Sequence, residues 1–92
     1  MVIGLCTIDL HLPGASSLKD KRSVLKSVIH RVRREFNVSI AEVDHQDIWR
    51  SAVLAVVCVS GDRAYAHGLL TRVVQWRTRL DAELVDYQIE ML

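Results

Sequence analysis

The clearest chemical feature of this sequence is a cluster of basic side chains: seven of the twelve Lys and Arg residues fall within residues 18–36. Only two acidic residues share that segment, which therefore carries a net charge of +5, whereas the other 73 residues carry five Arg and nine acidic residues, net −4. Such a basic segment on an acidic body suits a polyanion or an acidic protein partner.

The spacing of the basic residues adds a geometric argument. Lys or Arg at positions 19, 22, 26 and 33 recur at steps of three, four and seven, so they line one stripe of a helix and could follow a phosphate backbone. A charged helix face exposed to water is the ordinary alternative. The residues predicted to bind nucleic acid are Lys19, Lys21, Arg22, Lys26, Arg33 and Arg34.

A second candidate is an anion site where a strand gives way to this helix. Backbone N–H groups at a helix N-terminus attract anions, and polar side chains nearby could assist them. The fuller glycine pattern of a phosphate loop is missing, and Ser17 is well placed as a plain N-cap, which we favour. The candidate anion-binding residues are Gly14, Ser16, Ser17 and Lys19.

A third group, of unknown role, lies on a short polar connection and comprises Glu42, Asp44, His45 and Asp47. These side chains include ligand types for a divalent metal. A structural zinc site, however, expects Cys and His in recognisable pairs, and the chain offers none. We therefore predict a hairpin turn stabilised by Asp side chains, with neither a metal nor a cofactor.

Catalytic chemistry finds less support. Cys6 and Cys58 stand in apolar strand patterns, where thiols are buried and unreactive. Asp9 and His11 share one face of a strand and could exchange protons, although a polar sheet surface is the commoner explanation. Trp49 and Trp76 are expected to pack in the core or at its rim, with indole N–H groups that need a partner. We therefore predict that the protein is not an enzyme.

These side chains must be positioned by six elements in the order β-α-β-β-α-β. Alternation of apolar and polar residues marks the strands, and apolar residues at helical spacing mark the helices. The expected ranges are 2–12, 18–36, 38–43, 50–60, a second helix marked by Ala66, Leu69, Leu70, Val73, Trp76 and Leu80, and a last strand with Val85, Tyr87, Ile89 and Met91 toward the core.

This order predicts an α+β, ferredoxin-like βαββαβ fold, a single domain over residues 1–92 with two helices on one face of a four-stranded antiparallel sheet. The uncovered face would carry Asp9, His11, Asp86 and Glu90, and a second subunit could bury it as a homodimer. The longest uncharged apolar run, 52–59, is too short to cross a bilayer, and no charged region precedes an apolar stretch at Met1. We predict a cytoplasmic protein without a membrane partner.

Five stretches of the chain form a specific pattern: LHLPG at 10–14, SLKDKR at 17–22, FNVS at 36–39, AEVDHQD at 41–47 and VDY at 85–87. This pattern resembles the YlxP-like family of small bacterial proteins, which is similar to ferredoxin-like domains and has no known function. The family's signature positions map onto Ser17, Leu18, Lys19, Lys21, Arg22, Asn37, Glu42, Asp44, His45 and Asp47.

The resemblance implies a role near the ribosome, because genes of this family tend to lie among those for translation initiation and ribosome maturation. It supplies no catalytic residues. In such a fold we expect the loop after the first strand and the hairpin at 44–47 to lie at opposite ends of the sheet, too far apart for one compact site.

The leading expectation is a non-catalytic binding module that contacts ribosomal RNA or a ribosome-assembly intermediate through the basic first helix. One alternative is a small phosphate-chemistry enzyme, because acylphosphatases share this fold, although their loop after the first strand should hold an Arg that is missing here. Another is an oligomeric, protein-binding module that acts through the open sheet.

Overall fold

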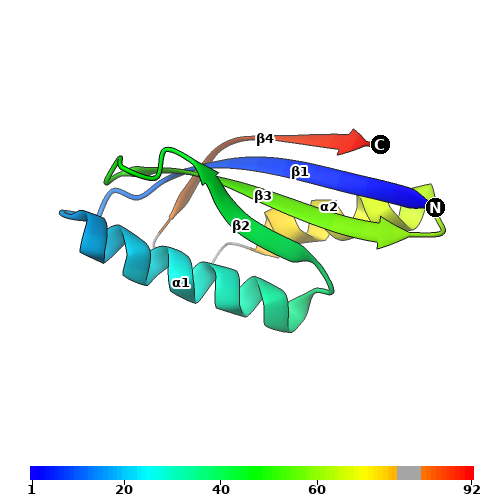
Figure 1. The fold of residues 1–92 in the computed structure, drawn as a ribbon, viewed down its shortest axis with the longest axis horizontal. Coiled ribbons are helices and arrows are strands. Elements are labelled where there is room, and N and C mark those ends of the chain that lie inside the picture. The colour runs from blue at the N-terminus through cyan, green and yellow to red at the C-terminus, as the bar shows by residue number, and fades with distance from the viewer. Residues whose placement is uncertain (77–81) are drawn as a thin grey trace.

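Six elements follow one another in the predicted order, and a computed structural model describes residues 1–76 and 82–92 (Figure 1). The position of Leu80, expected in the second helix, lies outside the described residues. The elements are β1 (Val2–His11), α1 (Leu18–Glu35), β2 (Ser39–Asp44), β3 (Ser51–Ser60), α2 (Arg63–Trp76) and β4 (Glu83–Met91).

The four strands form one open antiparallel sheet in the order β2-β3-β1-β4, which confirms the ferredoxin-like topology. Alternation along β1 directs Cys6, Ile8 and Leu10 to the side covered by the two helices. On this side Cys6 lies opposite Val56 of β3, and Ile8 lies opposite Leu54. The core therefore lies between this face and the apolar sides of α1 and α2 (Figure 1).

The limits of α1 follow from local interactions. Ser17 has extended backbone angles and its hydroxyl accepts a hydrogen bond from the Asp20 N–H at 3.1 Å, so it is the N-cap. Leu25, Val28 and Val32, at helical spacing, are buried against the sheet. Within residues 1–76 and 82–92, no helix is both long and apolar enough to cross a membrane.

The last strand departs from the predicted alternation. The register between β1 and β4 shifts so that Leu84 lies opposite Leu10 while Asp86 lies opposite Asp9, which makes Val85 an extra, bulged residue. Val85 is 67% exposed, so its expected core position was wrong. Tyr87 lies opposite Ile8 but is 44% exposed, because β4 is an edge strand that the helices cover only in part.

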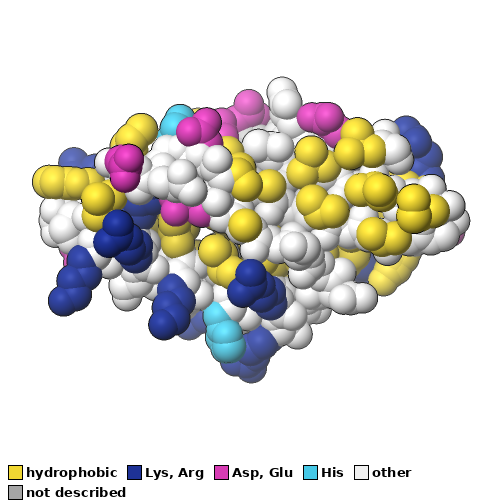
Figure 2. Space-filling view, in the orientation of Figure 1, with side chains coloured by type: hydrophobic (Ala, Val, Ile, Leu, Met, Phe, Trp, Pro, Cys, Tyr) yellow, Lys and Arg dark blue, Asp and Glu magenta, His cyan; other side chains and the backbone are white. Residues whose placement is uncertain are grey.

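The pairing of the strands shows which residues lie on the face of the sheet that the helices leave uncovered. Asp9 pairs with Val53 on one side and Asp86 on the other, and Leu5 pairs with Val57 and Glu90, which confirms the predicted polar residues of this face. Figure 2 shows its hydrophobic side chains gathered toward the end where both termini lie, with acidic side chains along β4. The face is thus apolar at one end and acidic along one edge.

Both cysteines are buried and free. They lie on the helix-covered face, where Cys58 pairs with Gly4 and Cys6 with Val56. Burial raises the pKa of the Cys6 thiol to about 11. Because the thiolate is the nucleophile, Cys6 is unreactive at neutral pH.

Gly4 gives a direct test of this packing. A Cβ at Gly4 would lie 2.9 Å from Leu70 Cδ1 and 3.2 Å from Cys58 Sγ, so Gly4→Ala overpacks the core and should lower the free energy of unfolding by about 1–3 kcal/mol. Gly68, inside α2, has open space around it, so Gly68→Ala should raise that free energy by about 0.5–1 kcal/mol. Urea unfolding measures the free energy of unfolding of both variants. If the two substitutions change it in the same direction, the packing around Gly4 is not as described.

Candidate functional site

The organising contact of the candidate site is a buried ion pair between α1 and β2. The Lys21 side chain is 1% exposed, its ammonium lies 2.8 Å from Glu42 Oε2, and it also donates a hydrogen bond to the carbonyl oxygen of His45. Lys21 shares a helix face with Leu25 and Val28, and this directs it inward. The expectation that Lys21 belongs to a nucleic-acid-binding surface was therefore wrong.

The residues of unknown role build the turn that receives this ammonium. His45 has φ 58, in the left-handed region, and its N–H donates to Asp44 Oδ1 at 2.8 Å. The His45 carbonyl also accepts the N–H of Ile48, and its Nδ1 lies 2.8 Å from Ser51 Oγ. Asp47 is exposed. Glu42, Asp44 and His45 thus hold the hairpin in place.

This hairpin and the β1–α1 loop meet at one end of the sheet, so the expectation of opposite ends was wrong. β1 ends where β3 begins, with His11 opposite Ser51, because the two strands are antiparallel neighbours. Arg50 joins the two loops: its carbonyl accepts the Leu12 N–H at 2.9 Å and its Nε donates to the Ala15 carbonyl at 3.0 Å. Residues 12–17 and 45–50 therefore form one continuous surface.

The candidate anion loop already contains a carboxylate. Ser16 donates both its N–H, at 3.2 Å, and its hydroxyl, at 2.6 Å, to Asp20 Oδ2, while Ser17 caps the helix. The pKa of Asp20 lies below its ordinary value. The main cause is the hydrogen bond from the Ser16 hydroxyl, followed by that from the Ser16 N–H and by the charge of Lys19. Gly14 and Lys19 are exposed. A phosphate at this loop would meet a negative charge and two serines that are already occupied.

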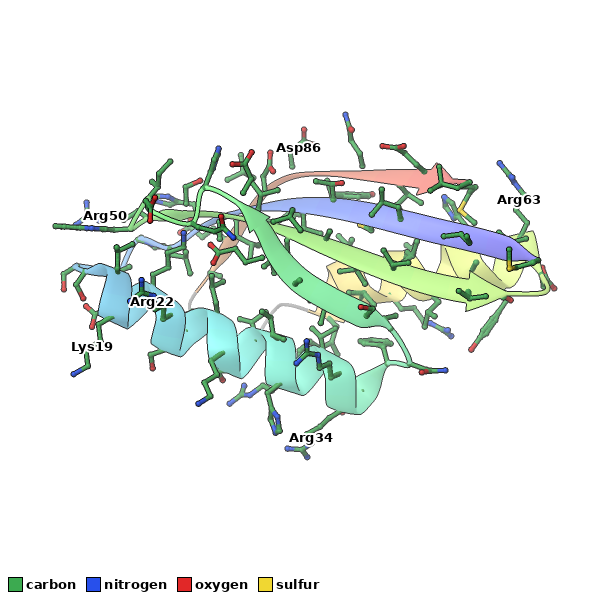
Figure 3. The ribbon with its side chains drawn as sticks, viewed as in Figure 1. Lys19, Arg22, Arg34, Arg50, Arg63 and Asp86 are labelled. Atoms are coloured by element: carbon green, nitrogen blue, oxygen red, sulfur yellow. The ribbon has the colours of Figure 1, made fainter. Side chains whose placement is uncertain are left out.

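The remaining basic residues of α1 lie on the surface. Figure 3 shows Lys19, Arg22 and Arg34 pointing away from the sheet, and Figure 2 shows basic side chains along α1. We call the exposed members of the predicted set the basic face; they are Lys19, Arg22, Lys26, Arg33 and Arg34. Arg31 of the same helix is exposed as well. In the part of the chain that the structure describes, the only ion pair is that of Lys21 with Glu42. The charge of Lys19 acts on the Asp20 carboxylate, but no carboxylate of the described residues forms an ion pair with the basic face.

An open groove borders the basic face. It has a volume of about 820 Å³ and separates α1 from the edge strand β2. Arg33 bridges the two elements by donating from Nη2 to the Ile40 carbonyl at 3.0 Å. Lys26 and His30 line the helix side. The groove thus places Lys26 and Arg33 of the basic face beside the edge of the sheet, where Glu42 also lines it.

Trp49 is the surface residue that sequence reasoning missed. Trp76 packs edge-on against Phe36, with ring centroids 6.3 Å apart, as expected of a packing residue. Trp49 instead stands 52% exposed on the hairpin, next to Ile48 at 48%. Its place beside the polar stretch 44–47, in a short connection between two strands, was the available signal. Over residues 1–76 and 82–92, no three His, Cys, Asp or Glu residues are grouped as metal ligands.

Comparison with known proteins assigns the family. The family model described as "Protein of unknown function (DUF503)" matches residues 3–89. The chain is also 38% identical over 73 residues to "Uncharacterized protein YlxP" of Bacillus subtilis (strain 168), an alignment that covers 79% of each protein. The chain therefore belongs to the DUF503 family of YlxP-like proteins, whose function is unknown.

The ion pair predicts a thermodynamic signature. Lys21→Met leaves Glu42 Oε2, which has no other partner among the described residues, buried and unpaired, so it should lower the free energy of unfolding by roughly 3 kcal/mol. The double variant Lys21→Met with Glu42→Leu should recover most of that loss, because no charge is stranded.

Lys26→Met, on the exposed side of the same helix, is the matched control and should change the free energy of unfolding by about 0.5 kcal/mol or less. Chemical denaturation of the four proteins measures these values. If the two lysine variants lose equal stability, the ion pair does not organise the site.

Proposed function

We propose that this DUF503 protein is a non-catalytic binding module that contacts structured RNA through the basic face of α1. The observation that carries the proposal is the set of exposed cations on one helix that form no ion pair with a carboxylate in the described part of the chain. Unpaired cations on a rigid helix release counterions when they meet phosphates, which gives affinity without base recognition.

The geometry of α1 suits a phosphate backbone. At a rise of 1.5 Å per residue, Lys19 and Arg33 are separated by about 21 Å along the helix axis, which is enough to contact several phosphates. Paired RNA has a deep, narrow major groove that side chains do not read, so contacts to its backbone are the expected mode for a helix of this kind. The acidic side chains along β4 would face away from the nucleic acid (Figure 2).

Ribosomal RNA, or a ribosome-assembly intermediate, is the RNA that we propose. The support is the resemblance to the YlxP-like family, whose genes lie near those for ribosome maturation, together with the basic face. A phosphate-transferring enzyme is less well supported, because the loop that would hold the phosphate binds the Asp20 carboxylate instead.

Charge reversal tests the proposal. The double variant Arg22→Glu with Lys26→Glu should weaken binding to ribosomal RNA fragments and lower the slope of log affinity against log salt by about two, one for each phosphate that the protein no longer neutralises. Binding measured across a salt series, with wild type beside the variant, gives both quantities.

The matched control is the double variant Arg63→Glu with Arg72→Glu in α2. Both residues are exposed, and the two substitutions change the net charge by the same amount as those in α1. This control should keep the wild-type slope. If both double variants bind RNA equally weakly, overall charge and not the basic face explains the binding. If the wild type does not bind RNA at low salt, RNA is not the partner.

A further inference from the structure

The hairpin at 45–50 presents an exposed aromatic ring on a restrained backbone. Trp49 is 52% exposed, and within the described residues it has neither an aromatic nor a cationic partner. The backbone on both sides of it is held, because His45 accepts hydrogen bonds from Lys21 and Ile48, and Arg50 binds Leu12 and Ala15. An exposed ring on a restrained loop loses little conformational entropy when a ligand covers it.

The same contacts place the hairpin that carries this ring at the end of the molecule where the basic face begins. Lys21, which anchors the hairpin, lies between Lys19 and Arg22 in the first turns of α1. Figure 3 shows Lys19, Arg22 and Arg50 at the same end of the molecule. A ligand that spans this end would therefore meet cations on the helix and an aromatic ring on the hairpin.

The two parts of this surface differ in the chemistry that they accept. The hairpin carries two carboxylates, of Asp44 and Asp47, which outnumber the one cation, Arg50, whose Nε already donates to the Ala15 carbonyl. Its exposed apolar side chains, Ile48 and Trp49, suit an uncharged planar group. The helix carries the cations that attract phosphate. This division matches a nucleotide that places its base on the hairpin and its backbone on α1.

We infer that Trp49 is a stacking platform for an unpaired base, and that the RNA recognised by this protein has a bulge or loop next to a paired stem. The inference rests on the proposed function and adds the class of RNA to it. Stacking on an aromatic side chain requires a base that has left its helix, so a fully paired stem would offer only its backbone.

The test compares two RNA stems that differ by a single bulged adenine. Wild-type protein should bind the bulged stem about 5- to 150-fold more tightly than the paired stem, the range that corresponds to loss of one base–aromatic stack. Trp49→Ala should bind both stems equally, and Trp49→Phe should keep most of the preference. Because Trp49 is exposed, all three proteins should share one unfolding midpoint.

The charge-reversal variant separates this inference from the function on which it rests. Arg22→Glu with Lys26→Glu should weaken binding to both stems by a similar factor and keep the preference for the bulge. If the wild type binds both stems equally and charge reversal weakens both, the stacking inference is wrong and RNA binding by α1 stands. If neither stem binds, both fall, and the apolar hairpin is then better explained as a protein-docking surface.

Discussion

The buried ammonium of Lys21 is the constraint on which the rest of the candidate site depends. It joins three separate segments, since it starts on α1, pairs with Glu42 at the edge strand and donates to the carbonyl of His45 in the hairpin. A buried ion pair contributes little net stability compared with well-packed apolar residues, but an unmatched partner is costly. The pair therefore fixes how α1 and the hairpin are placed more than it strengthens the fold.

That placement determines which side chains share a surface. The hairpin sits on the first turns of α1 and on the loop that precedes them, with Arg50 as a second connection. In that loop, the Asp20 carboxylate accepts both the N–H and the hydroxyl of Ser16. Positive charge is consequently displayed along the outside of α1 and not concentrated in a pocket at its N-terminus, which is an arrangement for contacting an extended polyanion and not for holding a single phosphate.

Local signals in the sequence were sufficient for the fold and for part of the site. Alternation and helical spacing predicted the order of elements, and Ser17 was correctly identified as the cap of α1. Three features depend on contacts between distant segments and could not be predicted in this way. Lys21 resembles its exposed neighbours until Glu42 is placed beside it, and Val85 leaves the core because of a one-residue shift in register. Trp49 is exposed because no element within residues 1–76 and 82–92 covers its side chain fully.

RNA contact through α1 and Trp49 is best tested by amide and indole NMR shifts recorded during titration with a bulged ribosomal RNA stem. Shifts are expected along the exposed side of α1 and at the Trp49 indole N–H. The Trp76 indole, which packs against Phe36, should stay nearly unchanged as an internal reference. Shifts centred on the open sheet face around Leu5 and Val57, with none along α1, would contradict this mode of contact.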